Sequence, residues 1–239
     1  MSNKKDSLGD RMKEYEGVTR NYLMRRNPVI IRVDGKAFHT FTKGFNRPFD
    51  EVLIQTMWDT TVELCKNIQG AKIGYVQSDE ISILITDYEK VETNAWFDNN
   101  LLKMCSISAS IATMAFNKAF SGHVMDFGYN CCEDFGKRFK SENDELIYNT
   151  YLKKINSAIF DSRVFQLPKE EVCNYFIWRQ QDATRNSIQM LGQANFSHKE
   201  LHGCSCNVIQ EKLFAEKGIN FNDIDTTKKR GAWYRKQHH

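Results

Sequence analysis

The sequence has little of several features that define whole classes of protein. Only three prolines occur among its 239 residues, and no apolar run approaches the roughly 20 residues that a membrane span requires. Low-complexity segments are missing, and the 12% aromatic content argues against disorder. We therefore expect a folded globular chain with no membrane contact.

Charge of one sign is not in excess either. The chain has 33 Lys and Arg against 30 Asp and Glu, a net charge of +3, and such a total can hide a local patch for nucleic acid. The seven cysteines are an odd number with scattered spacing, and the opening MSNKKDSLGDRMKEYE has no apolar stretch typical of a secretory signal. We expect a cytoplasmic protein with free thiols.

Two segments have the composition of strands. The β-branched run PVIIRVDG, residues 28–35, is closed by a turn dipeptide and predicts a buried strand that delivers Asp34 to its end. Residues 71–85 contain two β-rich arms around a short polar centre, which predicts a hairpin. The tip of this hairpin consists of Ser78, Asp79 and Glu80.

Helical periodicity dominates much of the remainder. Apolar residues at helical spacing predict a helix over residues 49–69, with Gly70 as its C-cap. A second helix is expected over 96–120, a fourth strand over 158–168 and a third helix over 169–193.

Three regions are less regular. Residues 121–157 are heterogeneous and charged, and we interpret them as an inserted excursion with some helix. Ser197 is placed as the N-cap of a further helix. The basic tail KKRGAWYRKQHH is expected to be irregular, and His238 and His239 are interpreted as remnants of a purification tag.

The order of elements from residue 28 onward is strand, helix, hairpin, helix, strand. This order predicts an α+β fold of the split βαβ, ferredoxin-like type, an antiparallel sheet with helices on one face. We expect one compact unit over 1–239, with a core over 28–168 and a C-terminal helical part over 169–239. On such a sheet Asp34 and Asp79 would meet at one end.

Two neighbouring carboxylates repel one another, which costs stability unless a cation lies between them. Mg²⁺ accepts one or two carboxylates together with water and substrate phosphate, and two such ions can clamp both oxygens of a phosphoryl displacement. The carbonyl of Gly35 could join, because glycine lets the main chain approach an ion closely. The alternative, that Asp34 fills a turn and Asp79 a hairpin tip, stays open.

The segment GKAFHTFTKGFNRPFD, residues 35–50, alternates basic and aromatic side chains. Its members are Lys36, His39, Lys43 and Arg47 with Phe38, Phe41, Phe45 and Phe49. Cations can neutralise a triphosphate and an aromatic face can support a nucleobase. The same alternation is equally typical of the rim of a hydrophobic core.

Several motifs in the correct order carry a resemblance. IRVDGKAFHTFTKGF, GYVQSDEIS, FDSRVFQLP and NYFIWRQQDATRNS strongly resemble the tRNAHis guanylyltransferase superfamily, whose polymerase-like palm extends RNA in the 3′-to-5′ direction. The resemblance runs from LGDRMK to the KRGAW tail. Residues 184–187 replace a His-Ile-Asn-Asn segment of the eukaryotic members, and with FSHKELHG the chain resembles the bacterial and archaeal guanylyltransferase-like branch. That branch is associated with template-dependent repair of tRNA truncated at the 5′ end.

The resemblance implies an enzyme with two Mg²⁺ ions that uses ATP, GTP and other nucleoside triphosphates on tRNA, working as a homotetramer. ATP would activate the 5′ end before nucleotide addition. The implied catalytic residues are Asp34, Asp79 and Glu80, and the implied metal ligands are Asp34, Gly35 and Asp79. The implied nucleotide-binding residues are Gly35, Lys36, Ala37, Phe38, His39, Arg47, Ser78 and Lys103. Asn100 occupies a position that is basic in the family, which leaves the activating-nucleotide contacts open.

Basic residues scattered along the chain are candidates for RNA phosphates, although each alone is also a common solvated surface charge. They are Arg20, Arg25, Arg26, Arg163, Arg179, Arg185, Lys199, Lys228, Lys229 and Arg230. Two other functions stay open, a palm-domain nucleotide cyclase and a non-catalytic RNA-binding module. His198, His202, Cys204 and Cys206 lie close in sequence but not at the spacing of a recognised zinc module.

Overall fold

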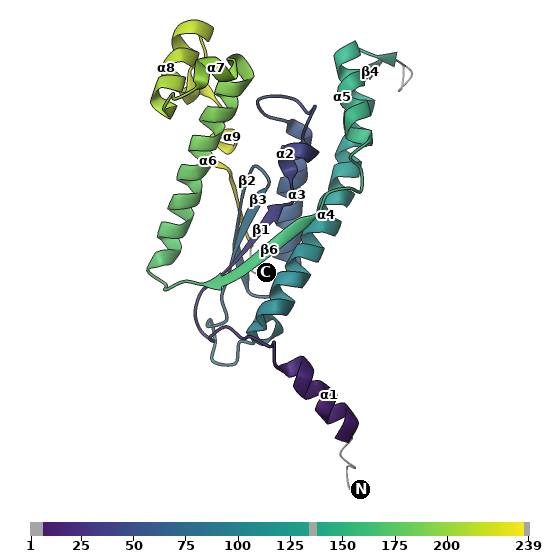
Figure 1. Cartoon of the computed structure of the whole chain (residues 1–239), viewed down its shortest axis with the longest axis vertical. Helices are drawn as coiled ribbons and strands as arrows, with labels where there is room; N and C mark the ends of the chain where they lie inside the picture. The colour runs from purple at the N-terminus through teal and green to yellow at the C-terminus, as the bar shows by residue number, and fades with distance from the viewer. Residues whose placement is uncertain (1–6, 134–137, 237–239) are drawn as a thin grey trace.

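A computed structural model describes residues 7–133 and 138–236. Within these ranges, five strands form one antiparallel sheet in the order β6-β1-β3-β2-β7. Figure 1 labels β1, β2, β3 and β6 of this sheet at the centre of the molecule. The strands are β1 (Val29–Gly35), β2 (Ala71–Gln77), β3 (Glu80–Ile85), β6 (Phe160–Gln166) and β7 (Ala232–Arg235). His238 and His239 lie outside the described residues.

The predicted α+β palm is confirmed. Helix α3 (Glu51–Asn67) follows β1, and α4 (Leu101–Asn130) follows the β2–β3 hairpin, in the predicted order. Alternate residues of β1, such as Ile31 and Val33, face these two helices and are fully buried with Phe116 of α4. Strand alternation and the helical apolar stripe therefore build one core between the sheet and its two palm helices.

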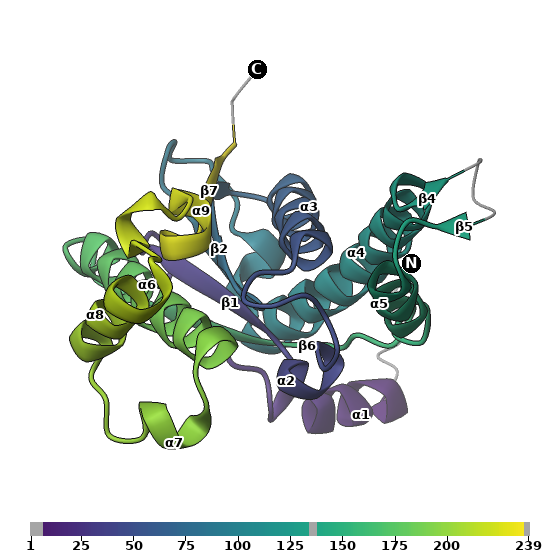
Figure 2. The ribbon, with the colours of Figure 1, turned by 90° about the horizontal axis from the view of Figure 1, so that it is seen from above.

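The opposite face of the sheet is also covered. Helix α6 (Glu171–Asn195) packs Tyr175 and Phe176 against Ile30 and Tyr75, the residues that point away from the palm helices. Figure 2 shows α6 on one side of the sheet and α3 with α4 on the other. The expectation of helices on one face holds for the palm, and the C-terminal helical part covers the second face.

The prediction of an irregular tail is wrong. Residues Thr226–Arg230 form helix α9, and β7 continues the sheet by pairing with β2, with Val76 opposite Ala232. Gly231 joins the two elements at a φ of 76°, and a Cβ there would lie 2.4 Å from the Val76 carbonyl oxygen. The strand has only four residues among basic neighbours, so the local pattern is too short to stand out.

The excursion over 121–157 begins as helix. Helix α4 extends to Asn130, past the predicted end at 120, because its buried stripe continues from Phe120 to Val124. A small hairpin of β4 (Cys132–Glu133) and β5 (Arg138–Phe139) leads into α5 (Glu142–Leu152), which contacts α4. In Figure 1 this arm, residues 121–133 and 138–157, extends above the labelled strands, on the opposite side of the view from α6 to α8.

Smaller elements complete the chain. They are α1 (Ser7–Gly17), α2 (Phe38–Phe41), η1 (Trp96–Asn99), α7 (His198–Leu201), α8 (Cys206–Lys217) and η3 (Phe221–Asp223). Ser197 caps α7 with a full capping box, as predicted. Gly70, however, lies beyond the C-cap of α3, which is Ile68, and occupies the turn into β2 at a φ of 79°. Among the described residues, no helix is both long and apolar enough to cross a membrane.

Candidate active site

The end of β1 and the tip of the β2–β3 hairpin lie side by side. Asp34 stands opposite Glu80 of β3 and Asp161 of β6 in the sheet register. The Gly35 amide donates to the Asp79 carbonyl oxygen at 3.1 Å. The predicted meeting of Asp34 and Asp79 is therefore confirmed, and sheet pairing across β1 and β3 is its cause.

Asp79 is a partly buried acid with no ion pair to any basic side chain of the described residues. Burial raises the pKa of its carboxyl, and the negative charge of Asp34 raises it further. The neighbouring Ser78 donates to Asp79 Oδ1 at 3.1 Å and has a φ of 50°, a conformation that costs energy for a non-glycine residue. The turn thus holds a carboxylate in a place where a cation would relieve its repulsion from Asp34.

The donor set at this point is two carboxylates with the nearby carbonyl of Gly35. Among the described residues, no three His, Cys, Asp or Glu side chains gather around one point, here or at His198 and Cys204. Such an incomplete set fits Mg²⁺, which keeps waters and takes further oxygens from substrate phosphate. It does not fit a closed zinc site, which needs four protein ligands.

Gly35 has a packing reason for lacking a side chain. A Cβ on this residue would lie 2.3 Å from Cδ2 of Phe38, because the buried Phe38 ring covers the glycine directly. Ala37, between them in the loop, has a φ of 54°. The local backbone after β1 is therefore tightly specified, in addition to any approach of an ion to the main chain.

Glu80 is held very differently from Asp79. It is 5% exposed, and the Arg179 guanidinium grips it with Nε 2.8 Å from Oε1 and Nη2 3.1 Å from Oε2. Arg32 Nη2 lies 2.5 Å from the same Oε2. Arg179 also contacts Asp182 at 2.7 Å and is 3% exposed, so the prediction that it binds RNA phosphate is wrong. The positive charge of Arg179 is already paired with Glu80 of β3 and with Asp182 of α6.

A cavity of about 580 Å³ opens beside the carboxylates, a volume suited to a small-molecule ligand. Predicted residues in its wall are Gly35, Ala37, Phe38, His39, Arg47, Ser78 and Asp79. Arg47 makes no hydrogen bond or ion pair within the described part of the chain, so its guanidinium is available to an anion. In the basic-aromatic segment, residues 35–50, the two kinds of side chain point different ways. Phe38, Phe41 and Phe45 are buried in the core, while the basic side chains are exposed.

Asp50, Met190 and Gln193 are among the residues of this wall that were not predicted from the sequence. Asp50 sits just before α3 as its N-cap, a position that the helix pattern alone could have indicated. Met190 and Gln193 come from α6, and no local signal marks them. Lys103, by contrast, does not line the cavity, and its ammonium lies 6.0 Å from the Phe97 ring centroid.

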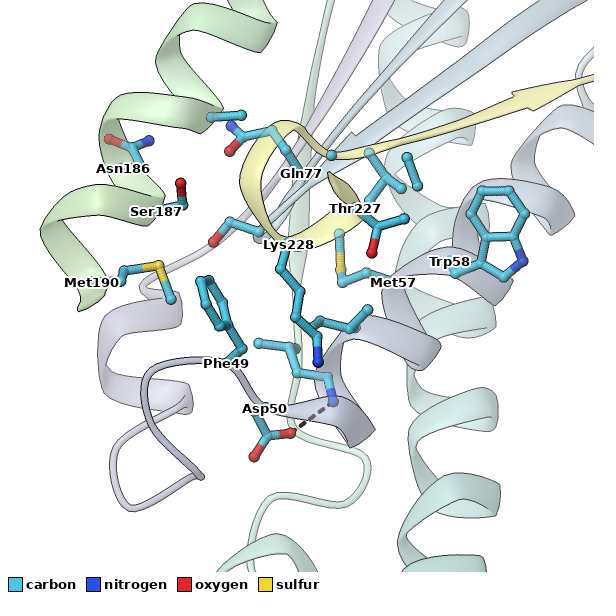
Figure 3. A pocket seen from close by; sticks show the side chains of 17 residues that line it. Phe49, Asp50, Met57, Trp58, Gln77, Asn186, Ser187, Met190, Thr227 and Lys228 are labelled. Carbon is cyan, nitrogen blue, oxygen red and sulfur yellow. Dashed lines mark hydrogen bonds between the residues drawn. The ribbon is translucent and has the colours of Figure 1, made fainter. Parts of the chain in front are cut away.

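A second, narrower cavity of about 100 Å³ adjoins the first and shares Asp50, Ser78 and Met190 with it. Figure 3 shows Phe49, Met57, Trp58 and Met190 among its lining side chains, together with Gln77. The Gln77 side chain has no hydrogen-bond partner among the described residues. This is a largely apolar slot with an unpaired amide, and it adjoins the cavity that Asp79 lines.

The predicted RNA-binding cations are dispersed. Arg163 is the candidate beside the carboxylates, half-exposed and with Nη2 3.6 Å from Asp34 Oδ2. Arg25 lies before the start of β1, at the other end of the strand, and pairs with Asp87 at 2.5 Å. Lys228 pairs with Glu51 at 3.1 Å, Lys229 donates to a carbonyl, and Arg185 pairs with Asp182. Within the described parts of the chain, the exposed candidates without such pairing are Arg20, Arg26, Lys199 and Arg230.

Comparison with known proteins places this geometry in a family. A family model described as tRNAHis guanylyltransferase matches residues 9–168. A bacterial tRNA(His) guanylyltransferase-like protein solved in complex with ATP is 47% identical, covers 97% of this chain and 89% of that one, and superposes with a TM-score of 0.81. A second such bacterial structure, in complex with GTP, is 41% identical over 98% of this chain and 86% of that one, with a TM-score of 0.71.

Curated relatives agree. The tRNA(His) guanylyltransferase of Debaryomyces hansenii is 24% identical over 89% of this chain and 74% of that protein, and an uncharacterised mimivirus protein is 28% identical over 97% of this chain and 78% of that protein. Matched motifs, sheet topology and paired carboxylates converge on one assignment: the chain belongs to the tRNAHis guanylyltransferase family and is a nucleotidyltransferase.

Proposed function

We propose that this enzyme adds nucleotides to the 5′ end of tRNA in the 3′-to-5′ direction, with the opposite acceptor strand as template. The observation that carries the proposal is the Asp34–Asp79 pair at the sheet end, next to a cavity of about 580 Å³ with a free Arg47 in its wall. Repair of tRNA shortened at the 5′ end is the proposed task, and addition of G to tRNAHis uses the same chemistry.

Two displacements at phosphorus make up the reaction. An oxygen of the RNA 5′ monophosphate attacks the α-phosphorus of ATP, so that a phosphoanhydride forms and pyrophosphate leaves. The 3′-hydroxyl of an incoming nucleoside triphosphate then loses its proton and attacks the activated 5′ phosphorus, from which AMP leaves. Positioning and charge neutralisation supply most of the catalysis in such reactions.

The protein's own groups divide this work. Asp34, Asp79 and the Gly35 carbonyl would hold two Mg²⁺ ions, which when bound neutralise phosphate oxygens and acidify a hydroxyl. Arg47 and His39 in the cavity wall contact the triphosphate, and Arg47 together with Lys36 of the same loop supplies positive charge to it. Glu80 does not touch substrate in this proposal; it keeps Arg32 and the start of β3 in place.

Nucleotide and RNA recognition follow from the surroundings. The apolar slot of Phe49, Met57 and Met190, with the free amide of Gln77, is suited to a nucleobase. Complexes of the similar bacterial proteins with ATP and with GTP support nucleotide binding at this fold. Arg163 beside Asp34 is the proposed contact for an RNA phosphate at the reacting end. Watson–Crick pairing with the template then selects the base, so the protein needs no base code.

The resemblance also supports a cytoplasmic homotetramer. Exposed apolar side chains on α4, Met114 and Met125, would have a place in such an assembly. Sedimentation equilibrium of the full chain tests this directly: a mass near four chains supports the tetramer, and a monomer contradicts it.

The proposed activity is tested with tRNA that lacks its 5′ nucleotide, Mg²⁺, ATP and labelled nucleoside triphosphates. We expect label at the 5′ end of the tRNA with wild-type protein and none with Asp79→Asn. Production of a cyclic nucleotide, or retention of RNA without any addition, would instead indicate a cyclase or a binding module.

A further inference from the structure

The arm contacts the loop that forms the cavity wall, residues 36–50. Lys154 Nζ donates to the Thr40 carbonyl oxygen at 3.1 Å. A Cβ on Gly44 would lie 3.2 Å from Cγ2 of Thr150, so helix α5 closes over this glycine. The Tyr151 ring packs edge-on against Phe45 with centroids 4.7 Å apart. Helix α5 and the residues after it therefore support the loop at several points along its length.

One of these contacts reaches the cavity itself. The Tyr151 hydroxyl donates to Asp50 Oδ2 at 2.5 Å, and both side chains are buried. Asp50 Oδ2 also accepts a hydrogen bond from the backbone N–H of Asn46 at 2.9 Å, while Oδ1 accepts one from the backbone N–H of Leu53 at 2.8 Å. Asp50 thus ties together the start of α3, the arm and the residue that precedes Arg47.

The direction of the Tyr151 bond is fixed by its environment. Burial raises the pKa of the Tyr151 hydroxyl, and the Asp50 carboxylate raises it further, so the hydroxyl keeps its proton and remains a donor. Arg47 lies between Asn46 and Asp50, both of which are ends of this hydrogen-bond cluster. The position of Arg47 therefore depends on a carboxylate whose orientation a residue of the arm holds.

We propose that Tyr151 is a positioning residue for nucleoside triphosphate binding, acting through Asp50 and the Asn46 amide on Arg47. The proposal rests on the proposed function, in which Arg47 contacts the triphosphate. It gives the excursion, whose role the sequence alone did not reveal, an indirect part in the site through Asp50, 101 residues earlier in the chain.

The chain offers a matched pair of variants on one helix. Tyr151→Phe removes only the hydroxyl and keeps the ring contacts with Phe45, Phe120 and Phe127. Tyr148→Phe removes a hydroxyl of the same helix that, among the described residues, donates only to Met125 Sδ, at 3.8 Å, away from the loop. A difference between the two reports the hydroxyl's action on the loop and not a general effect on α5.

The experiment measures the Kd of ATP with Mg²⁺ in the absence of RNA, and then KM and kcat for nucleotide addition. We expect Tyr151→Phe to weaken ATP binding about tenfold, the low end for a hydrogen bond to a charged group. KM for the nucleoside triphosphate rises by a similar factor while kcat at saturation changes less than about twofold. Tyr148→Phe should match wild type.

A double-mutant cycle distinguishes positioning from plain structural support. In an Arg47→Ala background, Tyr151→Phe should have little further effect on ATP affinity, because its route of action is gone. If Tyr151→Phe fails to fold, Asp50→Asn, which keeps the N-cap of α3 but weakens the acceptor of the same hydrogen bond, should still raise the Kd about threefold.

Unchanged ATP affinity in folded Tyr151→Phe, or full additivity with Arg47→Ala, would overturn the proposal. Failure of the proposed function looks different. Wild-type protein would then bind ATP yet add no nucleotide to tRNA, and the Kd comparison of the two tyrosine variants would still decide the role of Tyr151.

Discussion

Asp79 and Glu80 are adjacent acids with opposite surroundings. Asp79 lines a cavity, has no cationic partner among the described residues and has its pKa raised by burial and by Asp34. Glu80 begins β3 on the face that α6 covers, where Arg32 and Arg179 compensate its charge. Both are acids at one hairpin tip, yet only the first is left with an unmet need for positive charge.

The presence or absence of a basic partner distinguishes a structural acid from one that can take part in the reaction. A carboxylate whose charge is already paired inside the protein gains little from a metal ion, while an unpaired one beside a second carboxylate gains much. Sequence adjacency does not separate these roles. The long-range contact between α6 and β3 does.

The largest expected effect is on catalysis by Asp79. Asp79→Asn keeps the shape but removes a metal-binding charge, so nucleotide addition should fall by at least about 10³-fold. A tRNA that already carries a 5′ triphosphate needs no activation by ATP, because pyrophosphate can leave in place of AMP. Single-turnover addition to such a tRNA therefore measures the loss in the addition step alone. Asp161→Asn, an exposed acid opposite Asp34 in the sheet, is the control and should stay within about threefold of wild type. Equal loss in both variants would remove the special role of Asp79.

The next largest effect is on stability and belongs to the Glu80 side. Arg179→Ala leaves Glu80 buried with one partner fewer, which should lower the free energy of unfolding by about 3–5 kcal/mol in a urea titration. Arg185→Ala, an exposed arginine that pairs with the same Asp182, should change it by less than about 0.5 kcal/mol. Similar changes in the free energy of unfolding for the two variants would show that the buried ion pair between Arg179 and Glu80 does not stabilise the fold.

Removing the negative charge of Asp79 should change stability less than Arg179→Ala does, and it should increase stability where Arg179→Ala decreases it. The folded-state pKa of Asp79 lies above the unfolded value, so the folded protein takes up a proton at this carboxylate first as pH falls. Without Mg²⁺, this group therefore adds stability as pH decreases through its folded pKa, and that contribution disappears as pH rises through it. Asp79→Asn should raise the melting temperature by about 2–4 °C at neutral pH without Mg²⁺, the equivalent of about 1 kcal/mol.

Mg²⁺ competes with that proton. The affinity of the protein for Mg²⁺ should fall as pH decreases through the Asp79 pKa, and this pH dependence should largely vanish in Asp79→Asn. Titration calorimetry at several pH values checks both points. A Glu80→Gln variant with the same loss of pH dependence would contradict the division between the two acids.

The smallest effect concerns RNA. Arg163→Ala should weaken tRNA binding about threefold and reduce its salt dependence by close to one charge, without changing the Kd of ATP. Arg25→Ala, at the far end of β1, should leave the affinity for tRNA near wild type. Filter binding over a range of salt concentrations separates them, and equal slopes would remove Arg163 from the RNA path.

Sequence patterns predicted the parts of the site that depend on local structure. The run VIIRVD and the polar tip between two β-rich arms placed Asp34 and Asp79 at one sheet end, because register and pleat follow from neighbouring residues. The basic-aromatic loop was also recognisable, although its phenylalanines turned out to be core while its cations stay in solvent.

Contacts between distant segments could not be predicted in this way. The grip of Arg179 on Glu80 joins residues 99 apart, and the Tyr151–Asp50 bond joins residues 101 apart. Met190 reaches the cavity only because α6 crosses the open face of the sheet. A sequence shows the charge of Arg179 but not its partner, so the candidate RNA contact at this position proves to be a buried ion pair.

The most direct test of the account is a template swap. Wild-type protein receives two tRNAs that lack the first 5′ nucleotide and differ only in the opposing base, together with Mg²⁺, ATP and all four nucleoside triphosphates. Template-dependent addition at the Asp34–Asp79 pair predicts that the identity of the nucleotide added at the 5′ end changes with the opposing base and that Asp79→Asn adds none. Addition of the same nucleotide to both tRNAs, or no growth at the 5′ end, would contradict it.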